Sequence, residues 1–240
     1  MPHSSVVMRW LCILAAWACL GADVPARKTL KVARTDDFEV TGDGSAASWK
    51  KAPWEPLVPR GDKRREDATQ VKVLYSTQGL YVLMQGADRK VTSTMKEDFA
   101  DLWKEDVFEV FLWPDEKTPL YFEYEISPLG YELPILVPNF NGKFLGWRPW
   151  HYEAGRKIKK ATTVQGGSKS SGSAASGWTA EFFIPFALLT PLQNVPPQPG
   201  AKWRANFYRM DYDDGQAAWD WSRVGPSFHD IENFGELVFE

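Results

Sequence analysis

Short runs of β-branched and aromatic residues recur along this chain, and each run ends at a turn signal. The run VKVLY at residues 71–75 is followed by STQG and then by LYVLM at residues 80–84, the pattern of a β-hairpin. VFEVFLW at residues 107–113 and LYFEYEI at residues 120–126 form a second pair. Because successive side chains of a strand point to opposite faces, such runs must pair and bury one face.

Further runs of the same character predict strands at residues 158–164, 178–184, 203–210 and 235–239. Helical patterns are confined to residues 46–51 and 186–189. The sequence therefore predicts an all-β fold: an antiparallel β-sandwich of two packed sheets, jelly-roll-like, with one or two short helices.

The Gly/Ser-rich stretch at residues 165–176 (QGGSKSSGSAAS) is flexible by composition. Strand-like runs flank it closely, so we interpret it as a long hairpin loop within one domain. A single domain is then expected over residues 23–240.

The first 22 residues have the pattern of a secretory signal peptide. Arg9 is the only charge before an apolar run (LCILAAWACL), and Gly21 and Ala22 form a plausible cleavage site. The pattern predicts export to the periplasm, the cell surface or the medium. Lipidation at Cys19 is disfavoured, because Trp17 occupies a position where a small or branched residue is expected.

Both cysteines of the chain lie in that leader, so the exported protein would contain no disulfide and no thiolate ligand.

No later segment approaches the roughly 20 apolar residues that a membrane span needs. The net charge is −3 and no basic stripe is present, which argues against a nucleic-acid partner. The chain contains 12 Trp, more than a core of this size needs, so we expect some at a binding surface.

Three acidic residues alternate with apolar residues on two neighbouring strands. Glu109 shares a strand face with Val107 and Phe111, and Glu123 and Glu125 share a face of the next strand. Together with Trp103 they would form a polar groove with an aromatic wall. Such a groove suits a sugar, whose C–H face stacks on an indole while carboxylates bind its hydroxyls. The alternation by itself favours a second interpretation, a solvated outer face.

Several segments, in order, resemble the family 9 carbohydrate-binding modules and the family 9-like, DOMON-like sugar-binding domains of exported bacterial proteins. They span most of the chain after the leader. The matching stretches are VTGDG at 40–44 with Trp49 and Ala52, the Trp103–Asp106–Glu109–Phe111 segment, FEYEISPLG at 122–130, GWTAEFFIPFAL at 177–188, WRANFYRMDY at 203–212 and FGEL at 234–237.

The resemblance implies a β-sandwich that holds a sugar between aromatic side chains and catalyses nothing by itself. Trp103 then corresponds to one stacking aromatic and Glu109 to a hydroxyl-binding carboxylate. The second aromatic is expected from the loop before the last strand, where Trp219 and Trp221 are candidates. An Arg that the binding members use is not evident.

Where that Arg is expected, this chain has Glu123 and Glu125, which we assign to the same site. Arg209 is placed there as a partner for Glu109 or its neighbours. The resemblance also implies a carbohydrate ligand, a possible association with a glycoside hydrolase and no required cofactor.

Structural calcium accompanies some members of the family. Asp211, Asp213 and Asp214 could supply oxygen ligands, although an ordinary acidic turn explains the same residues more simply.

Two other functions remain open. Glu109 with Glu123 or Glu125 could act as the paired acids of a glycoside hydrolase, but the sequence gives no reason for the pKa values of the two acids to differ. A b-type haem between a Met (Met84, Met95 or Met210) and His151 or His229 is the third. Buried Met residues are more often packing residues.

Overall fold

The computed structural model describes residues 27–61, 68–190 and 192–240. The predicted signal peptide and Cys19 lie outside these residues. The described chain is all-β, as predicted, with only short 3-10 helices. Its elements are β1 (Thr29–Arg34), η1 (Ala47–Lys51), β2 (Glu55–Pro59), β3 (Thr69–Tyr75), β4 (Gly79–Ala87), η2 (Leu102–Lys104), β5 (Val107–Trp113), β6 (Leu120–Ile126), β7 (Glu132–Phe140), β8 (Lys143–Phe144), β9 (Arg148–Pro149), η3 (Ala154–Arg156), β10 (Lys159–Gln165), β11 (Gly177–Pro185), β12 (Lys202–Asp211), β13 (Ala217–Asp220), η4 (Ile231–Asn233) and β14 (Gly235–Phe239).

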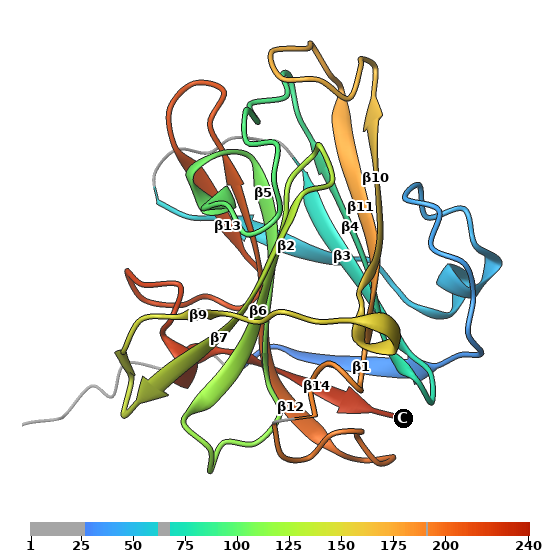
Figure 1. Cartoon of the computed structure of the whole chain (residues 1–240), viewed down its shortest axis with the longest axis vertical. Coiled ribbons are helices and arrows are strands. Elements are labelled where there is room, and N and C mark those ends of the chain that lie inside the picture. Colours follow the sequence, from blue (N-terminus) through green and yellow to red (C-terminus); the bar gives the residue numbers. More distant parts are fainter. Residues whose placement is uncertain (1–26, 62–67, 191) are drawn as a thin grey trace, which may run out of the picture.

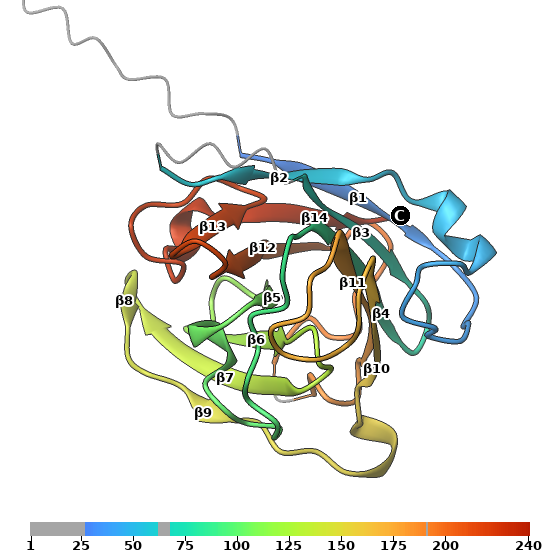
Figure 2. The same cartoon turned by 90° about the horizontal axis from the view of Figure 1, so that it is seen from above.

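The strands form one hydrogen-bonded path in the order β10-β11-β4-β3-β1-β14-β12-β5-β6-β7-β8 (Figure 1). Strands β2 and β13 connect β3 back to β12, so that β3, β1, β14, β12, β13 and β2 close a ring. Figure 2 shows β12, β13 and β14 between β2 and the β5–β7 group. Strand β1 is parallel to both β3 and β14.

This topology corrects the predicted sandwich in two respects. The two layers are joined by β1 and by the β2–β13 pair, and the pairing is not antiparallel throughout. The sequence could not show the joining strands, because β1 and β2 are short and have weak apolar patterns.

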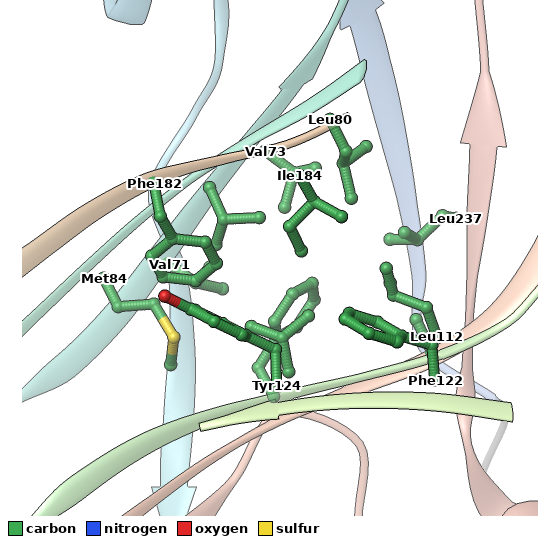
Figure 3. Close-up of a cluster of buried hydrophobic side chains, with 14 of the residues drawn as sticks. Val71, Val73, Leu80, Met84, Leu112, Phe122, Tyr124, Phe182, Ile184 and Leu237 are labelled. Atoms are coloured by element: carbon green, nitrogen blue, oxygen red, sulfur yellow. The ribbon is translucent and has the colours of Figure 1, made fainter. Parts of the chain in front are cut away.

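The main core lies between β3, β4 and β11 on one side and β5, β6 and β14 on the other. Figure 3 shows side chains of both groups pointing toward one another. Burying apolar side chains of this size contributes about 1.5–3 kcal/mol each before entropy is counted. The labelled members are Val71, Val73, Leu80, Met84, Leu112, Phe122, Tyr124, Phe182, Ile184 and Leu237.

Strand β5 shows how this core positions the outer face. Phe108, Val110 and Leu112 point into the main core, so Glu109 and Phe111 must point away from it. The outer face of β5, β6, β7 and β12 carries a second apolar cluster, which includes Leu102, Val224, Ile231 and Phe234 from the loops above it. Loops and short helices therefore cover part of this face.

The VTGDG segment is held by one buried acid. The Glu181 carboxylate of β11 accepts hydrogen bonds from Trp49 Nε1 at 2.8 Å, Gly42 N at 2.7 Å and Thr41 N at 3.0 Å. Gly42 has a φ of +88°, and a Cβ there would lie 2.8 Å from the Cβ of Ala161. Only glycine fits this turn without strain.

Most predicted elements are confirmed. Strands β5, β6 and β14 have the predicted limits, and the β3–β4 hairpin is present. Residues 165–176 connect the antiparallel strands β10 and β11, as expected of a hairpin loop. Residues 186–189 form turns rather than a helix. In the ranges described, no helix is long and apolar enough to cross a membrane.

Candidate functional site

A pocket of about 430 Å³ opens on the outer face of β5, β6, β7 and β12. Its volume is within the range of small-molecule sites. Three carboxyl groups lie at its base and aromatic rings form its walls. The lining residues are Trp103, Glu109, Phe111, Glu123, Glu125, Ile135, Phe144, Trp147, Met210, Gln216, Pro226, Phe228 and His229.

Strand register brings the three acids together. Glu109 lies directly opposite Glu125 in the β5–β6 ladder. Glu123 precedes Glu125 by two residues on β6, so its side chain points to the same face. Side chains directly opposite one another on antiparallel strands have Cβ atoms about 4.5–5.5 Å apart. The structure thus brings together the acids that the sequence analysis assigned to one groove.

Burial decides between the two interpretations of these acids. Glu109, Glu123 and Glu125 are 2%, 4% and 1% exposed, so the solvated outer face is wrong. Among the residues that the structure describes, the Oε2 atoms of Glu123 and Glu125 have no hydrogen-bond partner. Buried polar atoms without partners are costly, and here they line a cavity that a ligand can enter.

The same burial controls the protonation of the acids. Burial raises the pKa of Glu109 to about 8. Burial, and then the neighbouring charge of Glu109, raises the pKa of both Glu123 and Glu125 well above the ordinary value. Burial therefore favours the protonated form of all three carboxyls, which can both donate and accept hydrogen bonds.

His229 lies beside the acids without neutralising them. Its Nδ1 is hydrogen-bonded to the Tyr121 hydroxyl and lies 3.8 Å from Glu123 Oε2. Its ring stacks on Phe144 with centroids 4.1 Å apart. Burial lowers the pKa of His229 to about 4, so the ring is neutral at pH 7. It forms part of an aromatic wall.

Trp103 of η2 stands at the mouth of the pocket with 44% of its surface exposed. The Tyr212 hydroxyl donates to the Trp103 carbonyl oxygen at 2.8 Å, which anchors the short helix. Lys104 Nζ lies 4.9 Å from the centroid of the indole ring. An exposed indole held in this way is a platform on which a planar or ring-shaped ligand can stack.

Three residues assigned to the site from the sequence lie elsewhere. Trp219 and Trp221 are each 1% exposed and belong to the main core, and Arg209 is fully buried. Arg209 Nη2 bonds to Asp211 at 2.7 Å and lies 3.3 Å from Asp88, while its guanidinium stacks on Trp219. The prediction that Trp219 or Trp221 faces the groove, and that Arg209 pairs with Glu109, is corrected.

The alternation of side chains along β12 explains why Arg209 does not reach the pocket. Arg209 neighbours Tyr208 and Met210 on β12, whose side chains point outward, so Arg209 must point inward. The aromatics that face Trp103 come instead from the residue 144–147 segment and from Phe228. The signal available in the sequence was the aromatic spacing of Phe144, Trp147 and Trp150 in one short segment.

A second acidic cluster lies near the start of the 212–216 turn. Oxygen atoms of Asp88, Asp211 and Asp213 lie within 4.8 Å of one another. Asp214 is instead on the surface, where it pairs with Arg89. The cluster offers only oxygen atoms, the donor type that Ca²⁺ prefers. The sequence analysis named Asp211 and Asp213 but missed Asp88, which is distant in the chain.

A family model described as carbohydrate family 9 binding domain-like matches residues 40–240. The chain belongs to this family. The match covers the three pocket acids, Trp103 and the Glu181-bound turn, and it confirms the resemblance that their order suggested.

One curated relative is similar in sequence, and several solved structures have a similar fold. A curated "Extracellular protein" of Arthroderma benhamiae is 29% identical over 202 residues, covering 78% of this chain and 87% of that protein. A crystal structure from Bacteroides uniformis has a TM-score of 0.74 at 18% identity, covering 90% of this chain and all of that one. A family 9 module from Caldicellulosiruptor kristjanssonii, solved with cellotriose, has a TM-score of 0.64 at 14% identity, covering 89% of this chain and 94% of that one. A module of that organism has also been solved with glucose, at a TM-score of 0.62 and 14% identity, covering 89% and 96% of the two chains.

Proposed function

We propose that this family 9-like domain is a non-catalytic carbohydrate-binding module whose ligand site is the Trp103–Glu109–Glu125 pocket. One observation carries the proposal: buried carboxyl oxygens that have no hydrogen-bond partner within the described ranges line a cavity with a half-exposed indole at its mouth. Sugar hydroxyls would satisfy those oxygens, and a pyranose ring would cover the indole.

The pocket walls support the same ligand class. Trp103, Phe144, Trp147 and Phe228 provide aromatic surface around a small polar base. A pyranose presents C–H bonds on its faces and hydroxyls at its edge, so it can satisfy both surfaces at once. The volume of about 430 Å³ suits one sugar or the end of a chain rather than a long internal stretch. The modules of Caldicellulosiruptor kristjanssonii solved with glucose and cellotriose support this class of ligand.

A hydrolytic role is the second candidate, because paired acids do lie in one pocket. Hydrolysis requires one carboxyl to remain ionised while the other stays protonated. Here burial raises the pKa of all three acids, so none is set apart as the ionised partner. The site therefore fits binding better than hydrolysis. A glycoside hydrolase partner stays a prediction.

Haem binding fits the pocket less well. Met210 and His229 do line it, but the three carboxyl groups occupy its base, where a porphyrin would need apolar surface. The Nδ1 atom of His229 is also engaged by Tyr121. Purified protein without a Soret band would exclude this function.

We further propose that the domain is exported and that Asp88, Asp211 and Asp213 hold a structural Ca²⁺. Export is supported by the leader pattern and by the extracellular relative. The calcium proposal is supported by the oxygen-only cluster, in which Arg209 would share the carboxylates with the ion.

Intrinsic tryptophan fluorescence tests sugar binding. The protein is titrated with glucose, xylose, cellotriose and soluble glycans, alongside Trp103→Ala and the matched variant Trp54→Ala. Trp54 is partly buried against a different cluster and does not line the pocket. We expect a saturable change that Trp103→Ala loses and Trp54→Ala keeps. No saturable response by any folded variant would contradict the proposal.

A further inference from the structure

Glu109, Glu123 and Glu125 line the pocket, and no Lys or Arg belongs to its lining in the described ranges. The titratable groups that face it or its acids come from three strands and two loops. They are Glu109 on β5, Tyr121, Glu123 and Glu125 on β6, Tyr208 and Tyr212 on or just after β12, and His229 before η4.

Two cations that lie against lining residues already have acidic partners. Lys104 Nζ pairs with Asp101 at 2.6 Å while lying over the outer indole. Arg60 pairs with Asp220 at 2.7 Å and lies over the ring of Phe228. Neither of these two cations is therefore left to pair with the pocket acids.

The three glutamates of the pocket are poorly placed to bind a metal ion. In the part of the chain that the structure describes, only Asp88, Asp211 and Asp213 bring three possible ligand atoms within 4.8 Å of one another. The three glutamates and His229 do not.

We propose that the pocket binds a sugar bearing a free amine, of the glucosamine class. This rests on the proposed function, sugar binding in the Trp103 pocket. An ammonium group carries N–H donors and no acceptor, which suits the buried Oε2 atoms of Glu123 and Glu125 that have no hydrogen-bond partner among the described residues. The pyranose ring would stack on Trp103, and the aromatic walls would add cation–π attraction.

Binding of such a ligand is coupled to proton release. Burial favours the protonated form of the three carboxyls when no cation lies beside them. An ammonium beside a carboxyl favours its ionised form, so the bound pocket gives up a proton. Binding of a neutral sugar does not require a carboxyl to lose its proton. Calorimetry in buffers of different ionisation enthalpy therefore separates the two ligand classes.

The test is isothermal titration calorimetry at pH 7 with glucosamine, glucose, N-acetylglucosamine and ethanolamine. Wild type is compared with Glu125→Gln and with Glu153→Gln, a matched change at an exposed acid outside the pocket. Circular dichroism checks that each variant is folded. We expect glucosamine to bind at least about tenfold more tightly than the other three, with proton release, since about 1.4 kcal/mol corresponds to tenfold.

Glu125→Gln should lose most of that preference and Glu153→Gln should keep it. Glucose or N-acetylglucosamine binding as tightly as glucosamine would overturn the amine inference and leave the proposed function standing. Ethanolamine binding as tightly as glucosamine would overturn the contribution of the sugar ring. Binding of none of them, together with a silent panel of glycans, would overturn the proposed function itself.

Discussion

Glu109 of β5 and Glu125 of β6 face each other across an antiparallel ladder, and each is almost fully buried. Like charges directly opposite on neighbouring strands are destabilising, and burial adds a larger cost. Burial raises the pKa of both acids, so the fold favours their protonated forms instead of pairing them with a basic residue of the pocket lining. Sites that bind ligands often carry such a cost in stability.

This arrangement makes stability depend on pH. Burial raises the pKa of Glu109 from 4.5 to about 8, so between these values the folded state holds a proton that the unfolded chain has lost. Stability must then fall as the pH rises through this window. We expect Glu109→Gln to unfold at a higher temperature than wild type at pH 8, and with little difference at pH 4. Thermal denaturation at both pH values checks this, and an equal difference at both would contradict it.

Trp219 and Trp221, two of the core tryptophans, should matter for stability. Trp221 packs against Gly235, where an added Cβ would lie 2.1 Å from its ring, and Trp219 packs on Arg209. Replacing a buried Trp by Ala typically costs about 3–5 kcal/mol. We expect Trp221→Ala to lower Tm by about 10 °C, at about 2–4 °C per kcal/mol. Trp103→Ala should leave Tm within about 2 °C of wild type. Differential scanning calorimetry gives both values, and the reverse order would overturn the assignment.

Glu181 should be a structural acid rather than a ligand-binding one. It accepts hydrogen bonds from the side chain of Trp49 and from backbone N–H groups of residues 41–44. Hydrogen bonds to a charged group contribute about 1.5–3 kcal/mol each. We expect Glu181→Gln to lower the free energy of unfolding by at least about 2 kcal/mol. Urea denaturation measures this loss, and unchanged stability would contradict the role.

Calcium should act on stability through the Asp88–Asp211–Asp213 cluster. A ligand present at 100 times its Kd stabilises the folded state by about 2.7 kcal/mol. We expect millimolar Ca²⁺ to raise Tm over EDTA-treated protein, and Asp88→Asn to abolish the shift. Asp214→Asn is the control, because Asp214 pairs with Arg89 outside the cluster. The same Tm with Ca²⁺ and with EDTA would exclude the ion.

Much of the fold could be predicted from local pattern. Strands β5, β6 and β14 have strong alternation or apolar runs bounded by turns, and their limits are as expected. Strand β7 was missed because Pro134 and Pro138 interrupt it. The Pro residues are tolerated because β7 pairs along its length with β6 alone, and β8 and β9 pair with only short parts of it.

The acids of the candidate site could be predicted from local pattern, but the loop residues around them could not. Alternation placed Glu109, Glu123 and Glu125 on one face, because that is a local property of two strands. It could not show whether solvent or loops cover that face. The partners of Trp103 come from residues 144–147 and from Phe228, which meet only through long-range folding.

The most direct test of sugar binding in the Trp103 pocket is a ¹H–¹⁵N spectrum of indole-labelled protein during titration with glucose, cellotriose and glucosamine. Single-Trp substitutions assign the resonances. The pocket predicts saturable shifts at Trp103 and Trp147, with Trp219 and Trp221 unchanged. Shifts confined to other tryptophans, or no saturable shift with any of these sugars, would contradict sugar binding in this pocket.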